Sequence, residues 1–284
     1  MMYKGFELTL SDSDFLSSDG EYSDLLKENR EKIVNKFNEV LLKNGKIDAD
    51  KIIEDWFPTG KYHVFISHSH KDIELAEQFA NWLYDKFKLT SFLDSHIWGY
   101  ANNLLRELNE NYAKNGEDTY AYEPAISHAA HVYLMLSTAL SEVIDKSECL
   151  FFINTNNTLE NIQIKGSEVE SRTASPWIMH ELKTSAIIRR YKSLDREKLI
   201  SESTGLEALE KSAGFSFSVP TEHLTKINET GLSKWAEDCG VEHYSDNIFL
   251  WAINLKKQKT GFDALDALYT SSMIKEDLEY DCQQ

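Results

Sequence analysis

The fold is decided by Tyr62-His63-Val64-Phe65-Ile66-Ser67, a short run of β-branched and aromatic residues that leads directly into an amphipathic segment. Such a run is typical of a strand that is buried on both faces. In the segment 72–87, apolar residues recur at helical spacing, which predicts a helix with one side against a core. A buried strand followed by a helix of this kind begins a βαβ unit, from which parallel sheets are built.

The same alternation continues along the chain. We predict strands over 90–94 and 148–154, helices over 101–112, 129–146 and 176–191, a fourth strand over 215–219, and a final strand or helix over 248–255. Strands that alternate with helices favour an α/β fold in which helices cover both faces of a parallel sheet.

The first 60 residues have a different character. Residues 1–20 are rich in Ser, Asp and Gly, which predicts an irregular lead-in, whereas 22–42 and 48–56 carry apolar residues at helical spacing. We therefore expect a helical N-terminal extension over 1–60, an α/β domain with insertions over 61–255 and a C-terminal tail over 256–284.

The charge and the apolar content exclude two classes of partner. The net charge of −17, from 30 basic and 47 acidic residues, opposes binding to nucleic acid, which needs a positive field. No apolar run reaches the roughly 18 residues that span a bilayer, and the N-terminal residues lack the apolar core of a secretory signal. The three cysteines are far apart and odd in number, so they predict neither a disulfide framework nor a zinc site. We expect a cytoplasmic protein that binds neither nucleic acid nor membrane.

Three loops are expected to meet at one edge of the sheet. They are 67–72, 94–99 and 154–175, and each follows the carboxyl end of a predicted strand, where α/β sheets bind their ligands. The last loop leads into Ser175-Pro176-Trp177-Ile178-Met179-His180-Glu181-Leu182.

This last stretch predicts a helix start that presents a carboxylate. Ser175 is a favoured N-cap, and Pro176 suits the first helical position. Trp177 and Glu181 are four residues apart and therefore share one face of the helix. An aromatic ring beside a carboxylate suits a ligand that carries positive charge. The alternative is a capped amphipathic helix with Trp177 in the core and Glu181 on the surface.

Four segments, in this order, resemble Toll/interleukin-1 receptor (TIR) domains. The segment from Val64 to Asp72 resembles the first TIR box, a hydrophobic strand that ends in Ile-Ser before a polar turn and an Asp. Phe92-Leu93-Asp94 resembles the second strand, and Leu150 to Asn154 resembles the central strand before the catalytic helix. Ser175 to Leu182 resembles the Ser-x-Trp-x-x-x-Glu-Leu motif at the start of that helix.

The resemblance implies a flavodoxin-like TIR fold and an enzyme that cleaves NAD+, with Glu181 at the position of the essential Glu. Size and composition resemble the prokaryotic TIR proteins of antiphage defence, including Thoeris-type systems, which consume NAD+ to make a nucleotide signal for a separate effector protein. TIR domains commonly complete their NAD+ site against a neighbouring copy, so self-association is expected. The segment 95–147 is long for the family, and we assign it and the N-terminal extension to assembly or partner binding.

Cleavage of the nicotinamide–ribose bond releases a neutral leaving group and leaves a sugar with oxocarbenium character. The reaction needs no metal or cofactor, but it needs a carboxylate near the ribose to oppose the developing positive charge. We assign this role to Glu181. The residues expected to bind the substrate are Ser67, His68 and Ser69 through hydroxyl and N–H groups, Asp94 through a ribose hydroxyl, Trp98 in a loop over the pocket, and Trp177 as an aromatic wall.

Several alternatives stay open. The run Ser67 to Ser69 also suits a plain turn and helix cap, Asp94 suits a cap, and Trp98 suits a packed loop aromatic. His68, His70 and Asp72 resemble the metal-binding run of metallo-β-lactamase-fold hydrolases, where they would hold zinc and activate water. A third class is a non-catalytic TIR adaptor, because the fold alone implies no activity. The product is open as well, between ADP-ribose, a cyclic isomer and a conjugate.

Overall fold

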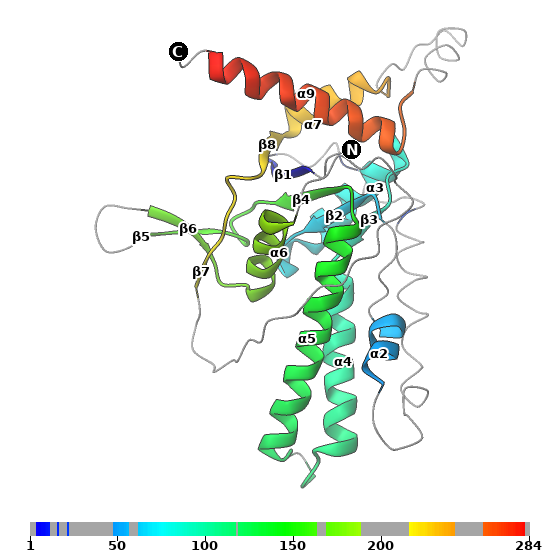
Figure 1. Ribbon diagram of the computed structural model, residues 1–284, viewed down its shortest axis with the longest axis vertical. Helices are drawn as coiled ribbons and strands as arrows, with labels where there is room; N and C mark the ends of the chain where they lie inside the picture. Colours follow the sequence, from blue (N-terminus) through cyan, green and yellow to red (C-terminus); the bar gives the residue numbers. More distant parts are fainter. Residues whose placement is uncertain are drawn as a thin grey trace.

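A five-stranded parallel sheet lies at the centre of the protein (Figure 1). The computed structural model describes residues 4–11, 16, 22, 48–56, 62–117, 119–163, 169–188, 216–241 and 258–281. From one edge to the other, the strands are β3 (Ser91–Leu93), β2 (Val64–Ser67), β4 (Cys149–Ile153), β1 (Lys4–Thr9) and β8 (Thr225–Asn228). All neighbouring strands run parallel. The predicted α/β fold with a parallel sheet is therefore confirmed, and the sheet is consistent with a flavodoxin-like fold.

Helices cover both faces of this sheet. On one face lie α3 (Ile73–Phe87), α7 (Glu229–Asp238) and α9 (Phe262–Asp281), and on the other lie α2 (Ala49–Trp56), α4 (Ser95–Tyr112), α5 (Tyr122–Lys146) and α6 (Pro176–Ile187). In β4, Phe151 packs with the first group, whereas Leu150 and Phe152 pack with the second. Successive side chains of a strand point to opposite faces, which is why a strand covered on both faces is apolar throughout.

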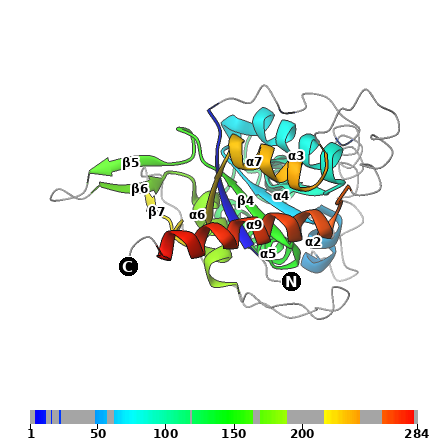
Figure 2. The same ribbon diagram turned by 90° about the horizontal axis from the view of Figure 1, so that it is seen from above.

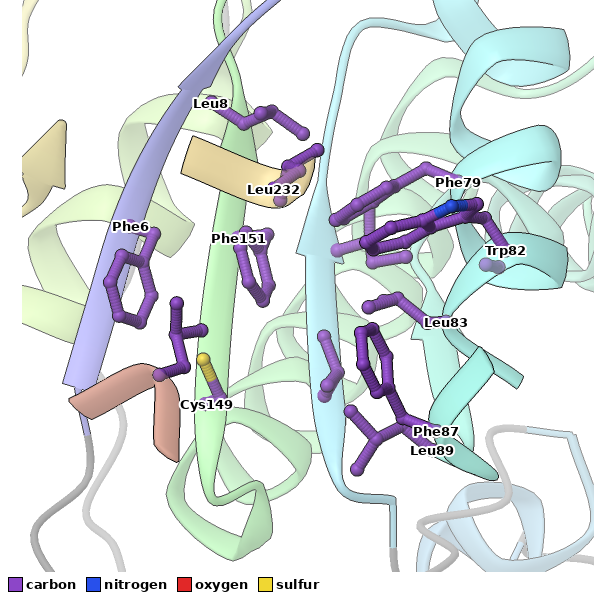
Figure 3. Packing of buried hydrophobic residues seen from close by; sticks show 14 of the residues in the cluster. Phe6, Leu8, Phe79, Trp82, Leu83, Phe87, Leu89, Cys149, Phe151 and Leu232 are labelled. Carbon is purple, nitrogen blue, oxygen red and sulfur yellow. The ribbon is translucent and has the colours of Figure 1, made fainter. Parts of the chain in front are cut away.

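Aromatic rings fill the core on the α3 face (Figure 3). Phe6 of β1 stacks on Phe151 of β4 with ring centroids 5.2 Å apart, and Phe79 of α3 meets Phe151 edge-on at 5.1 Å. Trp235 of α7 stacks on Phe87 of α3 at 4.1 Å. Burying a side chain as large as Phe contributes about 1.5–3 kcal/mol. This core therefore ties the N-terminal strand to helices from the middle and the end of the chain.

The position of β1 corrects one prediction. The irregular lead-in predicted over 1–20 is wrong for Lys4–Thr9, which pairs with β4 on one side and β8 on the other. The physical reason is the alternation of Phe6 and Leu8, which have no exposed surface, with small or polar residues.

A flavodoxin-like sheet has the order 2-1-3-4-5, so the fourth place normally goes to a strand that follows the third in the chain. Here the N-terminal strand takes that place, so part of the predicted extension lies within the sheet.

Other predicted elements are present with shifted bounds. The predicted helices over 48–56, 72–87 and 176–191 correspond to α2, α3 and α6, and the strands over 90–94 and 148–154 correspond to β3 and β4. Helix α4 begins at Ser95, so the loop predicted over 94–99 is wrong. Helix α5 begins at Tyr122 because Pro124 falls in its first turn, where proline is tolerated. The helix predicted over 22–42 lies outside the described residues, apart from Tyr22.

A small antiparallel sheet replaces the loop predicted over 154–175. It consists of β5 (Glu160–Gln163), β6 (Val169–Thr173) and β7 (Phe217–Ser218), in that order. The pair β5–β6 extends away from the main sheet (Figure 2). The strand predicted over 215–219 therefore corresponds to β7 and belongs to this sheet rather than to the parallel one.

The predicted C-terminal tail contains α9. Its residues Leu265 and Leu268 are buried in the same core as Phe6 of β1. Part of the tail is thus packed against the sheet. The segment 248–255, predicted as a strand or helix, lies outside the described residues.

Helices α4 and α5 form a long hairpin that projects from the sheet (Figure 1). The far end of this hairpin carries exposed apolar and aromatic side chains, namely Tyr112, Tyr120, Tyr122 and Ile126. The hairpin accounts for the length of the segment 95–147. No helix in the described part of the chain is both long enough and apolar enough to cross a membrane.

Candidate active site

The candidate site lies where the sheet changes its direction of winding. Strand β2 connects through α3 to β3 on one side, whereas β4 lies on its other side. Connections that leave in opposite directions open a crevice at the carboxyl ends of the two strands. Ser67 is the last residue of β2, and α6 is the helix that follows β4 and the β5–β6 pair. Ser67 and the residues of α6 are therefore the first candidates for a site.

The start of α6 has the predicted geometry. The Ser175 side chain accepts a hydrogen bond from the backbone N–H of Ile178 at 3.3 Å, and Pro176 occupies the first turn. Ile178 and Leu182 are buried in the core beneath the helix, and Glu181 lies between them in sequence. The Glu181 side chain has no exposed surface, so the alternative that placed it on the surface is wrong.

Ser67 and Glu181 meet directly. Ser67 lies two residues after Phe65, which packs on the α6 face, so the Ser67 side chain points to that face as well. Its Oγ donates a hydrogen bond to Oε2 of Glu181 at 2.6 Å. The other carboxyl oxygen, Oε1, is buried and has no hydrogen-bond partner among the described residues. A buried acceptor without a donor is unusual in a folded protein and marks a place where a ligand could donate.

The surroundings of Glu181 favour its neutral form. Its pKa is raised well above the usual range, first because burial removes water from the carboxylate. The negative charge of Asp94 raises the pKa further, whereas the hydrogen bond from Ser67 lowers it. Asp94, which the sequence assigned to the substrate, thus acts on the carboxyl that the sequence assigned to catalysis.

Asp94 is held by residues that directly follow β2 and β3. One oxygen of its carboxylate accepts a hydrogen bond from the backbone N–H of Ser95 at 2.8 Å and lies 3.0 Å from Nδ1 of His68. Nε2 of His68 lies 3.0 Å from Oγ of Ser95. Burial by itself lowers the pKa of His68, but Asp94, the Ile66 carbonyl and Asp72 raise it, and the net shift is upward. Both ring nitrogens of His68 are therefore occupied by protein groups.

Ser69 of the predicted substrate site and Asp72 of the alternative metal site have other roles in the structure. Ser69 caps the short 3₁₀ turn His70–Asp72, because its side chain accepts a hydrogen bond from the backbone N–H of Lys71 at 3.4 Å. This is the cap that the alternative interpretation of Ser67 to Ser69 predicted. Asp72 accepts hydrogen bonds from Thr155 Oγ1 and Asn157 Nδ2, both at 2.6 Å, and so fixes the loop after β4.

The hypothesis of a metal site rests on His68, His70 and Asp72. Two of these side chains bind other groups: His68 contacts Asp94 and Ser95, and Asp72 binds the loop after β4. Within the described residues, no three His, Cys, Asp or Glu side chains are grouped closely enough to hold a metal ion.

Of the two predicted tryptophans, the structure describes the side chain of Trp177. The Trp177 ring is half-buried, with its centroid 5.9 Å from that of Tyr133 on α5. Trp98 lies within α4 rather than in a loop, and its side chain is outside the described part of the structure. Their roles as an aromatic wall and a gate stay predictions.

Two further residues belong to the neighbourhood of the site but were not predicted. Ser95 links Asp94 and His68, and its signal was its position directly after a strand-ending Asp. Glu7 is 8% exposed on β1, and its Oε1 accepts a hydrogen bond from Nδ2 of Asn154 at 2.6 Å. Glu7 on β1 is in register with Phe152 on β4, and Ser67 on β2 is in register with the same residue from the opposite edge of β4. Glu7 was missed because β1 itself was not expected.

The arrangement supplies a buried carboxyl with a free acceptor, a hydroxyl donor and a second carboxyl at the carboxyl end of a parallel sheet. Groups of this kind can bind sugar hydroxyls and oppose positive charge. A carboxyl with a perturbed pKa, such as that of Glu181, is also a general mark of functional sites. Comparison with protein-family models, with curated proteins and with solved structures finds no match to this chain.

Proposed function

We propose that this protein is a TIR-type NAD+ nucleosidase that cleaves the nicotinamide–ribose bond, with Glu181 as its catalytic residue. The observation that carries the proposal is the Glu181 carboxyl, which is fully buried beside the end of β2 with Oε1 unpartnered. The order of the TIR-like segments adds support, because it puts Ser67, Asp94 and Glu181 next to one another.

The chemistry follows from the charge of the substrate. The nicotinamide ring of NAD+ is cationic, and as it leaves, the positive charge passes to the ribose. An ionised Glu181 opposes this charge, and its Oε1 is free to accept a hydrogen bond from a ribose hydroxyl. A cation beside Glu181 also favours the ionised carboxylate over the neutral acid. Binding of the substrate therefore helps to create the charge that the reaction needs.

The burial of Glu181 gives the proposed enzyme a low resting activity. With no exposed surface on this side chain, NAD+ reaches it only when the groups that cover it move apart. We propose that self-association provides this opening, as in TIR domains that complete their site with a second copy. The product, whether ADP-ribose, a cyclic isomer or a conjugate, would then act as a signal for a separate effector in antiphage defence.

The test compares wild-type protein with Glu181→Gln, which keeps the side-chain volume and removes the charge. Each is incubated with NAD+, with and without phage-infected lysate, and the products are identified by mass spectrometry. We expect the variant to lose on the order of 10² or more in rate, the usual effect of removing a positioned electrostatic group. Glu142→Gln is the matched control, because Glu142 lies on α5 in an ion pair with Lys146 away from Ser67 and Asp94.

Two outcomes would count against the proposal. Unchanged turnover in a folded Glu181→Gln variant would refute the role of Glu181. Absence of NAD+ cleavage by the wild-type protein under every condition would favour the non-catalytic adaptor instead.

A further inference from the structure

Glu7 on β1 is a buried carboxylate to which the proposed reaction gives no role. It is 8% exposed, and its Oε1 accepts a hydrogen bond from Nδ2 of Asn154 at 2.6 Å. Among the described residues, this amide is its one hydrogen-bond donor, and no lysine or arginine forms an ion pair with it. Buried carboxylates are normally paired with cations or with several donors, so Glu7 can still accept a hydrogen bond from a ligand.

Glu7 points to the same face of the sheet as the proposed catalytic residue. Its neighbours Phe6 and Leu8 pack on the α3 face (Figure 3). Because successive side chains of a strand alternate, Glu7 points to the opposite face, which α6 covers and to which Glu181 belongs.

The two carboxyls lie on either side of one aromatic residue. Glu7 and Ser67 are both in register with Phe152, and Ser67 donates the hydrogen bond that holds Glu181. Two strand spacings separate the backbones of Glu7 and Ser67, which is about 10 Å. The Phe152 side chain points to the same face between them. The carboxyls are therefore placed to bind different parts of one extended ligand.

We infer that Glu7 is a specificity-determining residue of this site: its carboxylate accepts a hydrogen bond from the 2′-hydroxyl of the adenosine ribose of NAD+ and repels the 2′-phosphate of NADP+. The identity of the ligand rests on the proposed function. A dinucleotide has two riboses joined by a pyrophosphate, and the nicotinamide ribose is assigned to Glu181, so the second carboxylate suits the second ribose. In dinucleotide-binding α/β sheets, an acidic side chain beside the crevice binds this same hydroxyl.

The loop after β4 holds the Glu7 carboxylate in place. The backbone N–H of Asn154 donates to the Leu8 carbonyl at 2.8 Å, and its Oδ1 accepts from Oγ1 of Thr158 at 3.3 Å. The remaining group of the amide, Nδ2, donates to Glu7. A carboxylate fixed in this way cannot turn away from an approaching phosphate, and a fixed repulsion is an effective means of excluding a wrong ligand.

Replacing Glu7 by Gln should move two affinities in opposite directions. ADP-ribose should bind more weakly, because a hydrogen bond to a charged acceptor is stronger than one to a neutral acceptor. ADP-ribose with a 2′-phosphate on its adenosine should bind more tightly, because the repulsion is removed. The exposed Lys226, in register with Glu7 on β8, then remains to attract the phosphate. A purely structural role of Glu7 would move both affinities the same way.

The experiment is isothermal titration calorimetry of the full-length protein with these two ligands. Both contain the adenosine ribose but no nicotinamide, so binding is measured without the proposed cleavage. We expect the wild type to prefer ADP-ribose by about tenfold or more and Glu7→Gln to reduce this preference by about tenfold, since juxtaposed like charges are strongly unfavourable. Glu142→Gln is the matched control, because Glu142 pairs with Lys146 on α5, and it should leave the preference unchanged.

An unchanged preference in Glu7→Gln overturns the inference, and so do equal losses of both affinities or a wild type that binds neither ligand. Should Glu7→Gln fail to fold, the wild type decides with the 2′-deoxyadenosine analogue of ADP-ribose, since equal affinity for the analogue and for ADP-ribose contradicts the inference. Cleavage of NAD+ together with an unchanged preference in Glu7→Gln would refute the inference alone. A preference that depends on Glu7 in a protein that never cleaves NAD+ would refute the proposed function alone.

Discussion

Oγ of Ser67 lies 2.6 Å from Oε2 of Glu181, in a buried hydrogen bond between the end of β2 and the second turn of α6. The two residues are 114 positions apart in the chain. This contact fixes the carboxyl relative to the crevice at the carboxyl ends of β2 and β4. The Ser67 hydroxyl therefore affects both the stability of the fold and the protonation of Glu181.

Replacing Ser67 by Ala should lower the free energy of unfolding by about 1–3 kcal/mol, because a buried acceptor loses its donor. It should also raise the pKa of Glu181 further, since the Ser67 hydrogen bond lowers it, and so slow the proposed NAD+ cleavage near neutral pH. Urea unfolding and a cleavage assay measure the two effects. Ser69→Ala is the control, because Ser69 caps only a 3₁₀ turn, and we expect a smaller change in stability. Equal effects of the two substitutions would contradict the special role of Ser67.

The stability of the protein should depend on pH through Glu181. Its pKa is raised well above 4.5 in the folded state, so above pH 4.5 the unfolded chain releases a proton that the folded protein keeps. The free energy of unfolding therefore falls as the pH rises, by at most about 1.4 kcal/mol per pH unit, until the pH passes the raised pKa. Glu181→Gln removes this slope and should gain stability relative to wild type across the same window. Urea titrations at a series of pH values test this, and parallel curves for the two proteins would rule it out.

Phe6→Ala tests the place of β1 in the sheet. Phe6 has no exposed surface and stacks on Phe151, so its loss should reduce the free energy of unfolding by about 3–5 kcal/mol. Asn102→Ala on the exposed side of α4 is the control and should change stability by less than about 0.5 kcal/mol. A Phe6→Ala protein as stable as the control would show that the N-terminal strand is not part of the core.

Removing metal ions should leave the proposed reaction unchanged. Departure of neutral nicotinamide needs no Lewis acid, and His68 and Asp72 are engaged with other protein groups. Dialysis against EDTA followed by the NAD+ assay checks this, with metal content measured before and after. Loss of activity that stoichiometric zinc restores would replace the NAD+ hypothesis with the metal hypothesis.

The sequence predicted the parts of the fold in which local signals agree. Val64 to Ile66 form a continuous apolar run because β2 is covered on both faces, and Ser175 with Pro176 marks the start of α6 through capping chemistry. Glu181 was located through the same local signal. These features depend on neighbouring residues, which a sequence displays directly.

The features that were missed depend on contacts between distant segments. Nothing near Lys4–Thr9 indicates that β4 and β8 will flank it, although Phe6 and Leu8 alternate with other residues as a strand requires. The effect of Asp94 on the pKa of Glu181 likewise depends on segments that are distant in the chain. The loop predicted over 94–99 was wrong because Asp94 caps α4 immediately, and a strand that passes directly into a helix leaves no turn residues to read.

The place of β1 between β4 and β8 also has a consequence for biosynthesis. This strand leaves the ribosome long before β4 and β8, so both of its hydrogen-bonding edges stay open while the rest of the chain is made. Its Phe6 and Leu8 have no core to enter until those later strands arrive. We expect the β2–α3–β3 unit to fold first, because its contacts are local, and β1 to insert last, at the cost of closing very long loops. Until that insertion, an unpaired apolar strand is available to neighbouring chains, which makes the nascent protein a natural client for chaperones that mask exposed strands.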